Sequence, residues 1–277
     1  MLDSRASIYK GRVGQGQAVS RLYRRGGSGD ISPLWPIHLR RDPALEAALA
    51  EFVIAFPALI FSLVAHEYAH AVAAWRQGDD TAYMLGRITL NPLPHLDPFM
   101  SVLVPALTLL GSGGSFVFGG AKPVPVTPRK YRNYRRGDII VSLAGVSTNF
   151  VLSFVFAALF VLVGLLGRSL PDAAGVLDSM QRMMMWGVWL NLLLCFFNLI
   201  PIPPLDGSHV LYHFLPPAWG QRYRELHRFG FLIVMLVVWL VPGLLMWLLA
   251  PARFVFVNLQ HVIVPFALGD GWRIFGR

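Results

Sequence analysis

Long runs without charged residues dominate the pattern of hydrophobic and polar positions along this chain. A helix needs about 20 apolar residues to cross the hydrocarbon core of a bilayer, so such runs predict transmembrane helices. Four runs meet this requirement, at residues 52–75, 139–167, 183–205 and 229–252. Among Asp, Glu, Lys and Arg residues, only Glu67 occurs inside these runs.

Two further apolar runs are short or interrupted. Residues 98–120 contain Pro105 and the glycine-rich stretch 111–114, and residues 254–269 carry three polar side chains: Asn258, Gln260 and His261. Non-helical backbone is tolerated at membrane depth where protein surrounds it or where it lines a cavity, so we expect these runs to be re-entrant or partly interfacial. The pattern predicts an all-α polytopic membrane protein with four transmembrane helices and one or two short or re-entrant segments.

Composition and charge support a membrane protein. The chain has 277 residues, of which 14% are charged, against roughly 25% in an average soluble domain. The net charge is +9, but the basic residues lie between the uncharged runs, a pattern that indicates membrane topology and no nucleic-acid partner. Cys195 is the single cysteine, which excludes an intrachain disulfide and a zinc site built on several thiolates.

The charged residue inside the first run belongs to a motif with its own chemistry. His66-Glu67-Tyr68-Ala69-His70 has the H-E-x-x-H pattern of zinc metalloproteases. Residues four apart share one helical face, so both imidazoles can reach one ion, while Glu67 can contact water bound to that ion. The alternative, two histidines flanking a glutamate without a ligand, would cost several kcal/mol inside a membrane helix.

A catalytic zinc site usually has three protein ligands and an open position for water, so a third ligand is needed. Asp206 follows a stretch in which Pro201, Pro203 and Pro204 must end or distort a helix, and Gly207 permits the turn after it. A capping Asp at the membrane surface is the alternative interpretation. Asp97 and His261 are the other candidates for the third ligand.

At these residues the chain resembles the site-2 protease family of intramembrane zinc metalloproteases, in the short form without a PDZ domain. The resemblance covers about residues 52–210 and rests on the H-E-x-x-H motif and on residues 198–207, whose family form is N-x-x-P-x-x-x-L-D-G. Residues 86–92, 95–98 and 121–126 also look like the family. The resemblance implies that His66, His70 and Asp206 bind one zinc ion per chain and that Glu67 is the catalytic acid/base.

The family's third conserved helix carries a G-P-x-x-N pattern, which residues 145–149 match except that Val146 replaces the proline. Asn149 and Asn198 are expected to donate hydrogen bonds to the substrate, although polar residues in membrane helices equally bond neighbouring helices. Residues 81–90 contain β-favouring side chains. They predict a small β-hairpin near the active site whose edge could hold an extended substrate, or an ordinary interfacial hairpin.

The expected reaction is hydrolysis of peptide bonds in or near transmembrane segments of membrane proteins, by zinc-activated water with Glu67 as general base and acid. One alternative is a non-catalytic zinc-dependent membrane binding protein, which would not need Glu67. The other is a membrane zinc peptidase that acts on soluble or lipidated termini. Such a peptidase usually takes a downstream Glu as third ligand, and no Glu lies between Glu67 and Glu225.

Three regions are expected along the chain: a basic, largely flexible arm at 1–44, a zinc-protease membrane core at 45–210, and C-terminal membrane helices with a tail at 211–277. The loop at 121–138 holds six basic residues, which predicts a multi-pass protein of the cell membrane with its active site towards the cytoplasmic half. A re-entrant segment at 98–120 would bring the ligands together but leave the arm outside. Full crossing of this segment would satisfy the positive-inside rule better.

Overall fold

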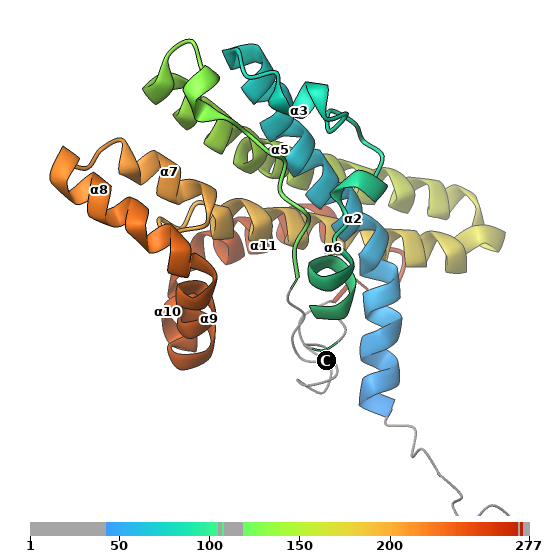
Figure 1. The fold of residues 1–277 in the computed structure, drawn as a ribbon. Helices are drawn as coiled ribbons and strands as arrows, with labels where there is room; N and C mark the ends of the chain where they lie inside the picture. The colour runs from blue at the N-terminus through green and yellow to red at the C-terminus, as the bar shows by residue number, and fades with distance from the viewer. Residues whose placement is uncertain (1–42, 105–106, 108–118, 271, 274–277) are drawn as a thin grey trace, which may run out of the picture. The chain divides into compact units, whose positions relative to one another are not determined.

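The computed structural model describes residues 43–104, 107, 119–270 and 272–273. All regular secondary structure in these ranges is helical (Figure 1), which confirms the all-α prediction. The arm predicted at 1–44 falls outside the described residues except for its last two positions, which begin the first described helix.

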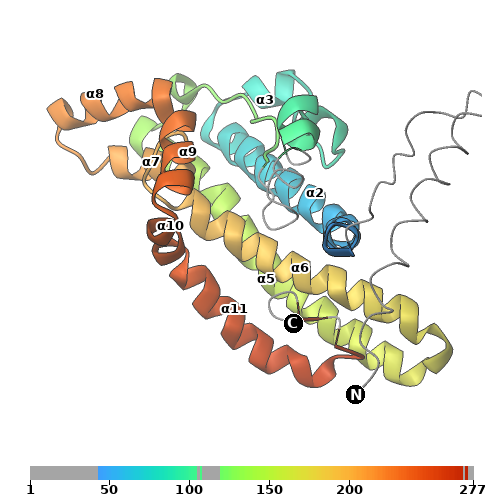
Figure 2. The same cartoon turned by 90° about the horizontal axis from the view of Figure 1, so that it is seen from below.

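Nine α-helices form the described part of the chain: α2 (Pro43–Gln77), α3 (Thr81–Met84), α5 (Tyr134–Ser169), α6 (Ala174–Asn198), α7 (Asp206–Tyr212), α8 (Pro217–Glu225), α9 (Gly230–Leu240), α10 (Pro242–Leu248) and α11 (Ala250–Ile263). Short 3-10 turns join several of them, and a π-helical turn, η2 (Pro98–Leu103), follows α3. In Figure 2, α5 and α6 run side by side, with α11 along them.

Two described helices are long and apolar enough to cross a membrane, α2 over Leu49–Gln77 and α5 over Tyr134–Ser169. They match the predicted runs 52–75 and 139–167. The third predicted run lies largely in α6, which spans 25 residues. Large apolar side chains are exposed along α5, among them Val151 and Leu162, as expected for a helix that faces lipid. Because only two of the described helices are long and apolar enough to span a membrane, the prediction of four transmembrane helices is not confirmed.

The fourth predicted run, 229–252, is not one helix. α9 ends at Leu240, Val241 has a non-helical backbone conformation, and Pro242 starts α10. Proline has no N–H to continue a helical hydrogen-bond ladder, and it is well tolerated in the first turn of a helix. The prediction of one continuous helix here was wrong because this proline divides the run.

The β-hairpin predicted at 81–90 is also wrong, since these residues form α3 and a turn. The buried carboxylate of Asp79 accepts hydrogen bonds from the backbone N–H and the hydroxyl of Thr81. This local bonding draws the chain into a helical turn instead of a strand. Tyr83 stacks on Trp75 of α2, with ring centroids 5.8 Å apart.

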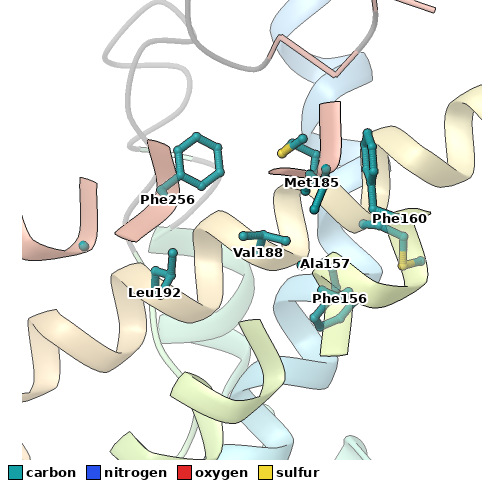
Figure 3. Packing of buried hydrophobic residues seen from close by; sticks show 11 residues of the cluster. Phe156, Ala157, Phe160, Met185, Val188, Leu192 and Phe256 are labelled. Carbon is teal, nitrogen blue, oxygen red and sulfur yellow. The ribbon is translucent and has the colours of Figure 1, made fainter. Parts of the chain in front are cut away.

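The main core lies where α5, α6 and α11 meet α2 (Figure 3). It contains buried residues from all four helices, including Phe156 and Phe160 of α5, Met185, Val188 and Leu192 of α6, and Phe256 of α11. This packing holds α5 and α6 together along their lengths, as a hairpin joined by a short connection after Ser169.

Backbone hydrogen bonds show that the segment between α2 and α5 returns to its starting point. The N–H of Arg132 donates to the carbonyl of Gln77 at 2.8 Å, and the N–H of Gly120 donates to the carbonyl of Met100 at 3.0 Å. Met100 and Gly120 are therefore neighbours. Residues 105–106 and 108–118, on which the re-entrant prediction also depends, lie outside the described part of the chain.

Candidate metal centre

The two histidines of the H-E-x-x-H motif meet on the inner face of α2. One helical turn separates them, and their Nε2 atoms are 2.9 Å apart. Both are withdrawn from solvent, with exposed fractions of 6% for His66 and 9% for His70. The spacing of four residues therefore brings the two imidazoles together as predicted.

Asp206 reaches the histidines because the chain turns sharply between α6 and α7. Its Oδ2 lies 3.2 Å from Nε2 of His66 and 3.3 Å from Nε2 of His70. A Cβ at Gly207 would lie 2.2 Å from the carbonyl oxygen of Leu199, so only glycine lets the turn close this tightly.

The hydrogen-bond partners of the two Nδ1 atoms determine which ring nitrogen of each histidine carries the proton. Nδ1 of His66 lies 2.5 Å from Oδ1 of Asn149, and Nδ1 of His70 lies 2.7 Å from the carbonyl oxygen of Val141. Because both partners are acceptors, each Nδ1 carries the proton and each Nε2 presents a lone pair.

Three acceptor atoms with no proton between them would repel one another, and a cation removes that repulsion. Ligand atoms about 2.0–2.1 Å from a tetrahedral zinc ion would stand roughly 3.3 Å apart, close to the spacings of 2.9–3.3 Å here. In the part of the chain that the structure describes, this is the one group of three His, Cys, Asp or Glu residues whose ligand atoms lie within 4.8 Å of one another. The donor set fits zinc.

α5 passes so close to the histidines that it has no room for a side chain. A Cβ built on Gly145 would lie 2.5 Å from Nε2 of His70 and 2.6 Å from Cε1 of His66. The G-x-x-x-N match at residues 145–149 thus supplies a glycine for this close approach and, one turn later, the amide that contacts His66.

Glu67 is held by the chain that leads into α5. Its Oε2 accepts a hydrogen bond of 2.7 Å from the backbone N–H of Val124. Pro123 and Pro125 have no N–H, so Val124 is the sole backbone donor of this tripeptide. Sequence reasoning did not find this contact, because it joins residues far apart in the chain.

The two predicted substrate-binding asparagines lie in different surroundings. Asn149 is fully buried, and its Nδ2 donates to Oδ1 of Asn191 at 2.8 Å and to the carbonyl of Ser62 at 3.3 Å. It therefore joins α2, α5 and α6, which is the alternative role weighed for it. Asn198 donates to the carbonyl of Leu194 in its own helix. Asn191 was missed, although a polar residue within the apolar run 183–205 was a signal.

The alternative third ligands lie elsewhere. Oδ1 of Asp97 accepts hydrogen bonds from the N–H groups of Phe99 and Met100, so this side chain caps η2. His261 is an exposed residue of α11. Neither belongs to the cluster with His66 and His70.

Comparisons with known proteins agree with this chemistry. Residues 172–241 match the profile described as "Peptidase family M50". The chain is 40% identical over 185 residues to a Bacillus subtilis protein named "Putative zinc metalloprotease YwhC", covering 66% of this chain and 78% of that protein. It is 33% identical over 196 residues to "Putative zinc metalloprotease Rip2" of Mycolicibacterium smegmatis, covering 71% and 70%. No solved structure matches the chain significantly.

Proposed function

Since the chain belongs to peptidase family M50, the site-2 protease family, it is an intramembrane zinc metalloprotease, and we propose which of its residues carry the reaction. His66, His70 and Asp206 bind the zinc ion, and Glu67 is the catalytic acid/base. The observation that carries this assignment is the convergence of three lone-pair atoms, two Nε2 and one Oδ2, within 2.9–3.3 Å of one another.

When bound, zinc lowers the pKa of a coordinated water from 15.7 towards about 7 and polarises the carbonyl of the scissile peptide bond. Glu67 accepts the proton of the attacking water and then delivers it to the leaving amine nitrogen. The N–H of Val124 holds Oε2 of Glu67, which leaves Oε1 to exchange the proton. This hydrogen bond also orients the carboxylate before the substrate arrives.

Asn149 and the carbonyl of Val141 act on the ligands and not on the substrate. Each holds the Nδ1 proton of one histidine, which directs the Nε2 lone pair to the metal. Such outer contacts fix the tautomer and raise the basicity of the ligand. The expected contact of Asn198 with the substrate stays a prediction.

The substrate is a transmembrane segment of another membrane protein. His66, Glu67 and His70 all lie within Leu49–Gln77, one of the two candidate spans, so the scissile bond must reach the site at or inside the bilayer. A peptide bond in an intact helix is shielded by the helical hydrogen bonds, and the substrate helix must therefore unwind locally before cleavage.

The protein crosses the cell membrane several times, with the site towards the cytoplasmic half. His70 in the last third of α2 contacts Val141 near the start of α5, so these two helices run antiparallel, and the turn after α6 returns to the same end. The basic loop at 121–138 belongs to this end, which supports a cytoplasmic position by the positive-inside rule.

The test is cleavage of candidate single-span substrates in liposomes by the wild-type protein and by Glu67→Gln. The wild type should cleave, and the variant should keep its zinc and its fold while losing most activity. Retained activity in Glu67→Gln would show that another group moves the proton. Cleavage of a soluble unstructured peptide as fast as of the membrane substrate would instead favour a membrane-anchored peptidase with an open site.

A further inference from the structure

A cavity of about 410 Å³ lies outside the candidate metal centre, between the start of α5 and the segment α7–α8. None of the three proposed zinc ligands lines it. Its walls carry four basic side chains and two phenol rings: Arg129, Arg224, His209, His227, Tyr134 and Tyr212. Cavities of this volume are typical of sites for small molecules or headgroups.

The acid that lines this cavity, Asp138, is already engaged within the protein. It is buried, its Oδ2 lies 2.7 Å from Nε2 of His213, and its Oδ1 lies 3.5 Å from Nδ1 of His209. His209 lies in α7, and His213 directly follows its last residue. The carboxylate therefore anchors the end of α7 to α5, and it offsets only part of the positive charge of the cavity walls.

Two arginines, Arg129 and Arg224, line the cavity. Arg224 lies over the ring of Tyr212, 4.0 Å from the centroid, and donates a hydrogen bond to the hydroxyl of Tyr134. This holds a long side chain in one position at the cavity wall. Arg129 is exposed on the 3-10 turn Pro128–Lys130.

Burial and the positive charge of the cavity walls both act on His227. Burial, the charge of His209 and the charge of Arg224 together lower the pKa of His227, although Asp138 acts in the opposite direction. An anion in the cavity would relieve this repulsion, as oppositely charged groups do when they approach within a few ångströms.

The lining residues stand where charged sequence gives way to apolar sequence. Asp138 immediately precedes the run 139–167, and His227 lies two residues before the run 229–252. Two aromatic side chains close in sequence to the lining residue Tyr212 are also exposed: the exposed fractions are 66% for Trp219 and 69% for Phe214. Aromatic and basic residues in this combination are typical of the membrane–water interface, at the depth of lipid headgroups.

We propose that this cavity binds a phosphate group, and that the source of the phosphate is the headgroup of an acidic phospholipid. The chemistry is shared with free phosphate, but the position at two polar-to-apolar boundaries favours the lipid. The choline group of a zwitterionic lipid would place its own positive charge next to the basic walls. A headgroup with a net negative charge is therefore preferred. Because α7 starts at Asp206 and contributes His209 and Tyr212 to the wall, the bound lipid stabilises α7.

The test measures lipid binding to the zinc-loaded full chain in detergent, by native mass spectrometry and by thermal unfolding, independently of proteolysis. Short-chain phosphatidylglycerol should bind and raise the Tm, whereas phosphatidylcholine should not. Arg129→Gln and Arg224→Gln should each weaken binding about tenfold or more, since a charge-assisted hydrogen bond is lost. The matched control is Arg222→Gln, on α8 but outside the cavity lining, which should bind as the wild type does.

Equal binding by wild type and Arg129→Gln would overturn the proposal, and so would equal binding of the two lipids. Arg129 lies exposed on a short turn, so this variant stays informative even if Arg224→Gln, which removes contacts with two tyrosines, fails to fold. If inorganic phosphate alone produces the full Tm shift, the occupant is a free anion and not a lipid. A soluble acidic peptide that displaces phosphatidylglycerol would instead identify a peptide as the occupant.

Discussion

Replacement of Gly145 by alanine tests whether α5 lies directly against the two histidines. The added Cβ would sit 2.5 Å from Nε2 of His70, whereas ordinary van der Waals contact begins at 3.4 Å. The ring or the helix must therefore withdraw by roughly 0.9 Å, the difference between these distances. Zinc sites depend on ligand distances that hold to about 0.2 Å, so a shift of this size removes a productive ligand position.

The effect of this substitution on folding should be modest. Alanine is favoured over glycine in a helix by about 1 kcal/mol, and overpacking in a core costs about 1–3 kcal/mol. The net cost to the stability of the metal-free protein is therefore about 0–2 kcal/mol. Zinc affinity should fall by at least the 10–100-fold loss typical of a disturbed outer contact, and proteolysis should fall with it.

The assay is competition for zinc with a chelator of known affinity, beside circular dichroism and a cleavage assay in liposomes. Gly175→Ala is the matched control, because this glycine also lies in a helix, α6, and a Cβ there has no neighbour within 4 Å. It should bind zinc normally. If Gly145→Ala holds zinc with wild-type affinity and cleaves normally, α5 does not press on the ligands as described, and the reasoning fails.

Four further outcomes are expected. The wild type should contain about one zinc per chain, and Asp206→Ala should lose most of it by metal analysis; full occupancy there would exclude this ligand. Glu67→Gln should keep zinc but lose 10²–10⁴-fold in cleavage rate, and wild-type turnover would contradict its role. Asn149→Ala removes the acceptor for Nδ1 of His66 and should weaken zinc binding about 10–100-fold in the chelator assay. Unchanged zinc affinity would mean that Asn149 does not act on His66, and a contact with the substrate would then be the preferred role. In a substrate series that varies helix propensity only, Gly or Pro near the scissile bond should speed cleavage, since they cost a helix about 1 and 3 kcal/mol; equal rates would mean that unwinding is not limiting.

Prediction from the sequence succeeded where the signal was local. The helical spacing of His66 and His70 depends on a separation of four positions, and the runs that became α2 and α5 depend on continuous stretches of apolar side chains. Prediction failed where nearby residues favour different backbone conformations. The prediction of one helix over the fourth run neglected the effect of Pro242. The strand propensity of residues 81–90 was outweighed by the hydrogen bonds that the carboxylate of Asp79 accepts from Thr81.

The sequence by itself determined the helical class, the H-E-x-x-H motif and the broken L-D-G turn, because each follows from residues that are adjacent or one helical turn apart. Only the tertiary structure decided what surrounds them. The contacts of Asn149 with His66, of Val124 with Glu67 and of Gly145 with both imidazoles join positions more than fifty residues apart. Such contacts depend on how α2 packs against α5 and against the segment that precedes α5, and this packing leaves no periodic pattern in a single sequence from which it could be read.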